Sequence, residues 1–180
     1  MAKVPKVSVY IQKPGFTPPT PEELEKLEPF FHRGGCKITK ISPTVAVKYG
    51  CGVDVKEAIT MEFIAEHTSI PVPKVHAVYT YGPFDRPEFD IVDEYDTYIF
   101  MDYIDGETLE KDWENQDSQA KSSIMADLKR CLEELRGLQG GTYVGSLENG
   151  PVLDQILDYK PNKGSWTPKS TFENYTETSS

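Results

Sequence analysis

A lysine and a glutamate close together in the sequence are the side chains best placed to do chemistry jointly. Lys48 ends a β-prone run, 44–47, in which three of the four residues are β-branched. A Gly-Cys-Gly turn follows, and then a segment with helical periodicity that carries Glu57. At about 100° per residue, Glu57 falls on the helical face that also carries Met61, Ile64 and Ala65.

Glu57 therefore points towards an apolar layer, where an unpaired carboxylate would cost several kcal/mol. Lys48 is its predicted partner, whereas Glu62 and Glu66 are expected on a polar strip. The pair is either a structural ion pair or the nucleotide-binding pair of protein-kinase-type phosphotransferases. In those enzymes a lysine from a V-A-[VI]-K strand holds the α- and β-phosphates and a helix glutamate holds the lysine. The run Ala46-Val47-Lys48 fits the strand half.

The elements before the lysine strand are predicted as a strand, a helix and a hairpin. The strand covers 7–11, and the helix begins at Thr20 as cap with Pro21 in its first turn. That helix is expected to reach about Phe31 and to bury Leu24, Leu27, Phe30 and Phe31. A turn at 32–35 then leads to a strand over 36–41. The glycines of that turn fall far short of a G-x-G-x-x-G phosphate loop.

Two further strands, 74–81 and 97–103, are predicted after the glutamate helix. The loop between them is rich in acids but lacks EF-hand spacing, so a solvated hairpin is favoured over a metal site. The second strand breaks into a turn at Asp105. Such a strand end is either a hinge whose free backbone groups can bind a flat heterocycle such as adenine, or a plain edge strand.

The segment 117–138 is the strongest helix pattern in the sequence, and it is predicted to be a core helix. Asp117 is its cap, and two glycines at 140–141 stop it. Its apolar face consists of Ile124, Leu128, Cys131, Leu132, Leu135 and Leu138.

Composition excludes several classes of protein. With 180 residues and 38% hydrophobic content the chain can build a core, and one domain, or one and a part, is expected. The net charge of −10 argues against nucleic acid or an anionic membrane surface as a partner. No apolar run has the length of a membrane span and no signal peptide is recognised, so a cytoplasmic location with reduced cysteines is expected.

These features together resemble the N-terminal half of the aminoglycoside phosphotransferase/choline kinase-like family, in particular its fungal branch. The resemblance covers about 41–154. Its most specific part is EAITMEFIAEHTSIPVPKVHAVY, residues 57–79. YIFMDYIDGETLE at 98–110 is similar to the family's hinge and following G-x-x-L, and YVGSLENGPVLD at 143–154 to the segment after its first C-lobe helix.

The resemblance implies an α+β fold with a protein-kinase-like N-lobe, an antiparallel sheet with a covering helix, followed by the start of a mostly helical C-lobe. The domains expected are an N-lobe at 1–104, an incomplete C-lobe at 105–160 and a polar tail at 161–180. The implied cofactor is ATP. Lys48 would hold its α/β-phosphates, Glu57 would orient Lys48, and the adenine hinge would be formed by backbone groups of Met101, Asp102, Tyr103 and Ile104.

The sequence departs from the family in its catalytic parts. The catalytic loop H-G-D-x-x-x-x-N and the second metal-binding aspartate are absent, since none of the three histidines, His32, His67 and His76, precedes Gly-Asp. No catalytic residue and no metal ligand is therefore assigned, and Mg²⁺ is expected only if the missing lobe is supplied.

The favoured interpretation is a truncated, inactive ATP-dependent small-molecule phosphotransferase whose acceptor is not specified by this sequence. The first alternative is a non-catalytic, pseudokinase-like module that binds a nucleotide, a small ligand or a protein. The second is a structural α/β domain without a ligand. Both kinase-derived interpretations predict exposed apolar surface on the 117–138 helix, through which the chain would self-associate or bind a protein.

Overall fold

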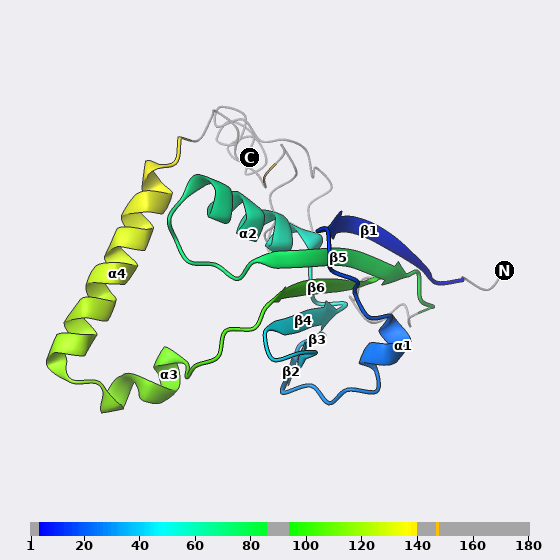
Figure 1. The fold of residues 1–180 in the computed structure, drawn as a ribbon, viewed down its shortest axis with the longest axis horizontal. Helices are drawn as coiled ribbons and strands as arrows, with labels where there is room; N and C mark the ends of the chain where they lie inside the picture. The colour runs from blue at the N-terminus through cyan, green and yellow to red at the C-terminus, as the bar shows by residue number, and fades with distance from the viewer. Residues whose placement is uncertain (1–3, 86–93, 140–146, 148–180) are drawn as a thin grey trace, which may run out of the picture. The chain divides into compact units, whose positions relative to one another are not determined.

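A six-stranded antiparallel sheet forms the centre of the computed structural model, which describes residues 4–85, 94–139 and Leu147. The strands are β1 (Lys6–Gln12), β2 (Phe31–Arg33), β3 (Cys36–Lys40), β4 (Val45–Gly50), β5 (Val75–Gly82) and β6 (Asp96–Asp102). Their order across the sheet is β1-β5-β6-β4-β3-β2 (Figure 1). The fold is thus α+β, as predicted, with the lysine strand β4 in the interior of the sheet.

The helices are α1 (Pro21–Leu24), α2 (Val55–His67), α3 (Leu109–Asp112), the 3₁₀ turn η1 (Trp113–Asn115) and α4 (Ser118–Gly137). Figure 1 shows α2 lying along β5. The chain divides into two compact units, residues 1–132 and residues 133–180. None of the helices in the described ranges has the length and apolarity needed to cross a membrane.

Each face of the sheet has its own hydrophobic cluster. On the α2 face, Ala58 of the helix packs with residues of the sheet and its connections, namely Val53, Val75, Val78 and Ile99. On the α1 face, Leu24 is fully buried against a layer made of Val47, Tyr49, Ala77, Tyr79, Tyr98 and Phe100. Side chains alternate between the faces along each strand, so the burial of both faces explains the nearly continuous apolar runs of β5 and β6.

The first helix is much shorter than the sequence predicted. Its start is confirmed: Thr20 and Glu23 form a reciprocal capping box, and Pro21 occupies the first turn. The helix ends at Leu24, however, and Phe31 begins β2. Leu24 is 0% exposed whereas Leu27 is 40% exposed, and Phe30 and Phe31 are exposed too. The end of this segment instead forms a hairpin with β3. Phe31 pairs with Ile38 of β3, and the Phe30 N–H donates to Ile38 O.

The prediction of a core helix over 117–138 is wrong. The helix itself is confirmed as α4, with Asp117 accepting a hydrogen bond from the Ala120 N–H at 2.7 Å. No residue of α4 is buried. Four of its large apolar side chains are exposed instead: Met125, Leu128, Leu132 and Leu135.

Some predicted features lie outside the described residues. They are most of the acidic loop, at 86–93, the motif at 143–154 apart from Leu147, and the polar tail at 161–180. The predicted domain boundaries stay predictions.

Candidate functional site

Lys48 lies in the middle of β4 with a strand on either side. It pairs with Ile38 of β3 and with Ile99 of β6. Ile99 belongs to the cluster under α2, so alternation places the Lys48 side chain on the α2 face. Ala46, two residues earlier, shares that face and is buried. The sheet thus places the Lys48 ammonium on the same face as the buried apolar residues Ala46 and Ile99.

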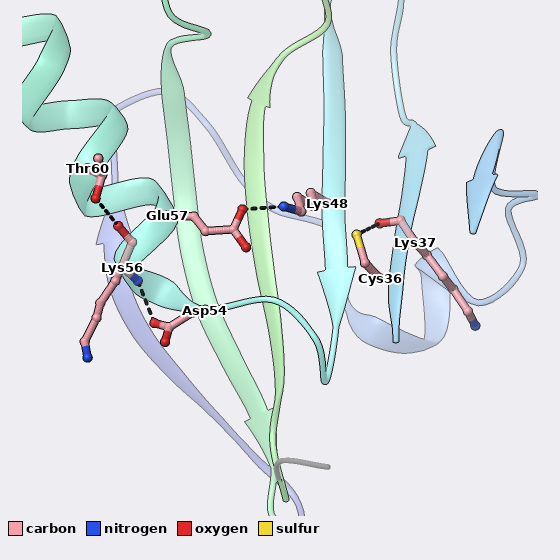
Figure 2. Close-up of polar contacts among 7 residues, drawn as sticks. All are labelled: Cys36, Lys37, Lys48, Asp54, Lys56, Glu57 and Thr60. Carbon is pink, nitrogen blue, oxygen red and sulfur yellow. Dashed lines mark hydrogen bonds and ion pairs between the residues drawn. The ribbon is translucent and has the colours of Figure 1, made fainter. Parts of the chain in front are cut away.

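Glu57 reaches Lys48 from the first turn of α2. Asp54 caps this helix by accepting from the Lys56 N–H at 2.8 Å, which fixes where the helix begins. Glu57 Oε2 then accepts a hydrogen bond from Lys48 Nζ, while Lys37 on the neighbouring strand points away (Figure 2). The predicted pairing of these two residues is therefore observed.

The environment of the pair differs from the one predicted. The side chains of Lys48 and Glu57 are 27% and 39% exposed, so Glu57 does not enter the apolar layer. Water screens the ion pair, whose contribution to stability is accordingly small. Glu62 is also not on a polar strip: it is only 24% exposed and accepts a hydrogen bond from Lys13 at 2.5 Å. Sequence periodicity could not show that the loop after β1 folds against α2.

Two glycine turns pack together beside the lysine strand. The Gly34-Gly35 turn, with both residues at positive φ, meets the turn that links β4 to α2. The Gly52 N–H donates to Gly35 O at 3.1 Å. A Cβ on Gly50 would lie 2.1 Å from Gly35 O, so this contact requires glycine. The sequence showed the glycines, but not that the two turns touch.

The predicted hinge keeps only some of its backbone groups free. The Asp102 N–H donates to Lys74 O at 3.0 Å and the Tyr103 N–H to Thr44 O at 2.8 Å. Met101 is partly buried against the cluster under α2. Within the described ranges, the N–H and C=O of Ile104 and the C=O of Tyr103 make no hydrogen bond, and Ile104 is 68% exposed. Tyr103 and Ile104 therefore leave backbone groups open among the described residues.

The Asp102 side chain is engaged on the opposite face of the sheet from Lys48. Its register partner is Val45, an odd number of residues from Lys48, so the two side chains point to different faces. Asp102 Oδ1 contacts His76 Nε2 at 2.7 Å and Oδ2 accepts from the Lys74 N–H at 3.2 Å. Sequence reasoning missed His76, because no local pattern links it to the hinge.

At the predicted hinge, the Lys40 ammonium lies over the ring of Tyr103. The Lys40 ammonium lies 3.7 Å from the centroid of the Tyr103 ring, and the Phe30 ring meets Tyr103 edge-on at 6.0 Å. Lys40 pairs with Ala46 in the sheet and so belongs to the Lys48 face. This corner therefore offers a second positive charge and exposed aromatic surface.

The charges of Lys48 and Glu57 both act on the Cys36 thiol. The Cys36 side chain packs against the cluster under α2. Burial raises the pKa of the Cys36 thiol; the Lys48 charge partly offsets this and the Glu57 charge adds to it. Cys36 therefore reports on both charges of the pair.

The described residues hold no group of three or more His, Cys, Asp or Glu side chains arranged to bind a metal. The structure does have an open hollow, lined by Gln12 to Thr17, but neither Lys48 nor Glu57 lines it. What the site offers is an ammonium held by a carboxylate, with open peptide groups at the end of β6.

Comparison with known proteins adds no relative. No protein-family model matches the chain, and neither the curated proteins nor the solved structures gave a match.

Proposed function

We propose that this chain is a kinase-like nucleotide-binding lobe, similar to that of the aminoglycoside phosphotransferase family, and that it binds ATP on the α2 face of its sheet. The observation that carries the proposal is the ion pair between Lys48 of β4 and Glu57 of α2. A lysine strand followed at once by a helix whose glutamate holds the lysine is the arrangement that such enzymes use for α/β-phosphates.

The order of groups along the sheet supports an elongated ligand. Ile99 is level with Lys48, and Ile104 follows five residues later, about 17 Å in an extended chain. The phosphates would meet Lys48, and the base would meet the open backbone groups of Tyr103 and Ile104. Asp102 acts indirectly in this scheme because its N–H and its carboxylate are already occupied.

Phosphoryl transfer would need groups beyond those of this sequence. The charge that develops on the transferring phosphoryl must be opposed by Mg²⁺ and its acidic ligands, which is most of the catalysis in such enzymes. The 180 residues contain neither the H-G-D-x-x-x-x-N loop nor the second aspartate motif. We therefore propose nucleotide binding without catalysis by this chain alone.

Calorimetric titration with ATP, with and without Mg²⁺, tests the proposal. Wild type should show saturable binding, and Lys48→Ala should weaken it roughly 10- to 100-fold, the effect of losing one charge-assisted contact. Lys37→Ala is the matched control, because Lys37 lies on the adjacent strand with its ammonium over Tyr49 on the other face. Absence of binding at millimolar ATP, or equal losses in both variants, would overturn the proposal.

A second candidate function is that of a protein-binding module. The observation in its favour is the exposed apolar side of α4. Exposed apolar surface of this kind marks interaction sites in many proteins. The partner would be a second copy of this chain or another protein.

A further inference from the structure

The loop that follows β1 is tied to both elements that carry the proposed nucleotide-binding groups. This loop, residues 13–17, is called the strap below. It crosses from the edge strand towards α1 and is not itself part of the sheet. The strap makes contacts with α2, with β5 and with the core, and each contact involves a different kind of interaction.

Lys13 provides two of these contacts. Its ammonium binds Glu62 of α2 at 2.5 Å, and its backbone N–H donates to His76 O of β5 at 2.9 Å. The side chains of Lys13 and Glu62 are 40% and 24% exposed. A single residue of the strap therefore links the second half of α2 to the strand beside β6.

Phe16 provides the third contact, which connects the strap to the hinge through His76. Its ring lies 5.3 Å from the His76 ring and 5.6 Å from that of Phe100, measured between centroids. His76 in turn binds the carboxylate of Asp102 at the end of β6. The strap is thus connected to the hinge through His76 as well as to α2 through Glu62.

Two of the three glutamates of α2, Glu57 and Glu62, bind different parts of the molecule. Glu57 binds the lysine strand and Glu62 binds the strap, and the helix is also packed on the sheet through Ala58. Glu57 and Glu62 are five residues apart, about 140° around the helix axis, so the two ion pairs hold α2 on different sides and rotation about its axis would break at least one of them. Rotation of α2 is the motion that would withdraw Glu57 from Lys48.

We infer that the strap is a brace and that Lys13 and Glu62 are positioning residues, which hold α2 so that Glu57 stays on Lys48 and the hinge stays in register. The inference rests on the proposed function for its effect on nucleotide binding, but the brace itself is a property of the unliganded chain. Lys13 and Glu62 need not contact the nucleotide.

Charge reversal tests the brace. Lys13→Glu and Glu62→Lys each place two like charges together and should weaken ATP binding about three- to fivefold, the range of one partly exposed ion pair. The double reversal, K13E/E62K, restores the attraction with the net charge of wild type and should restore the affinity. Lys6→Glu, an exposed change of the same charge in β1, controls for long-range repulsion of ATP.

Hydrogen exchange of the unliganded chain separates failure of the brace from failure of the proposed function. Each single reversal should speed exchange of amides in 62–67 and in 101–104, and the double reversal should return it to the wild-type rate. If wild type binds no ATP, these rates alone decide the inference. Unchanged exchange and affinity in the single variants, or failure of the double reversal to rescue them, would overturn it.

Discussion

At the scale of single residues, the proposed function depends on one ammonium group held by one carboxylate. Lys48 and Glu57 were predicted to pair because Glu57 falls on the apolar face of its helix and Lys48 stands at the end of the preceding predicted strand. That prediction is confirmed by the geometry, although the role of the pair in binding a nucleotide stays a prediction. The burial predicted for Glu57 was wrong, since helical periodicity gives a direction for a side chain but not the depth of the surface around it.

Removing the carboxylate should affect the nucleotide only through the lysine. Glu57→Gln should weaken ATP binding about fivefold, less than Lys48→Ala, because the amide can still accept a hydrogen bond without holding the charge. The K48A/E57Q double variant should bind no more weakly than Lys48→Ala alone. A titration series of the four proteins checks this, and simple addition of the two losses would contradict it.

The reactivity of Cys36 should report on the same two charges. Its raised pKa means less thiolate at pH 8 than an unperturbed thiol has, so alkylation should be slow. Glu57→Gln removes a negative charge, lowers the pKa and should speed the reaction, while Lys48→Ala should slow it further. Alkylation rates from peptide mass spectrometry test the signs, and equal rates in both variants would contradict the electrostatic account.

At the scale of elements, strands were predicted better than the ends of helices. Alternating β-branched and aromatic residues located β3 to β6 closely, because these strands combine strong propensity with turn residues at their ends. The helix that starts at Thr20 was predicted too long: a capping box marks a beginning, and the hairpin that ends the helix at Leu24 depends on β3, a later part of the chain. His76 and the strap were missed for the same reason.

The observed end of α1 at Leu24 leads to a prediction about stability. Leu24→Ala should lower the free energy of unfolding by about 2–5 kcal/mol, because it opens a cavity at a fully buried site. Leu27→Ala, which the longer predicted helix would place on the same buried side, should cost less than about 1 kcal/mol. Urea denaturation measures both, and similar losses in the two variants would favour the longer helix.

At the scale of the whole molecule, α4 carries large apolar side chains that are exposed to solvent. The sequence predicted both a helix with one apolar side and exposed apolar surface on it, and these are observed, whereas its prediction as a core helix is wrong. Amphipathic periodicity shows that a helix has a face to bury. It does not show what buries that face.

Replacing part of this face should change the behaviour of the purified chain. Wild type should bind a hydrophobic dye or self-associate, and the Leu128→Gln/Leu132→Gln variant should do so several-fold less. The Asp127→Gln/Arg130→Gln variant removes an exposed ion pair from α4 and serves as the control. Fluorescence titration and sedimentation measure the two properties, and a dye-silent monomeric wild type would rule out the second candidate function.

Whether a nucleotide binds the α2 face of the sheet is tested most directly by amide shifts in a nuclear magnetic resonance titration with ATP. The account predicts saturable shifts at Lys48, Glu57 and Ile104, and smaller ones at Lys37, whose side chain lies on the other face. Shifts confined to other parts of the chain, or none at millimolar ATP, would contradict it.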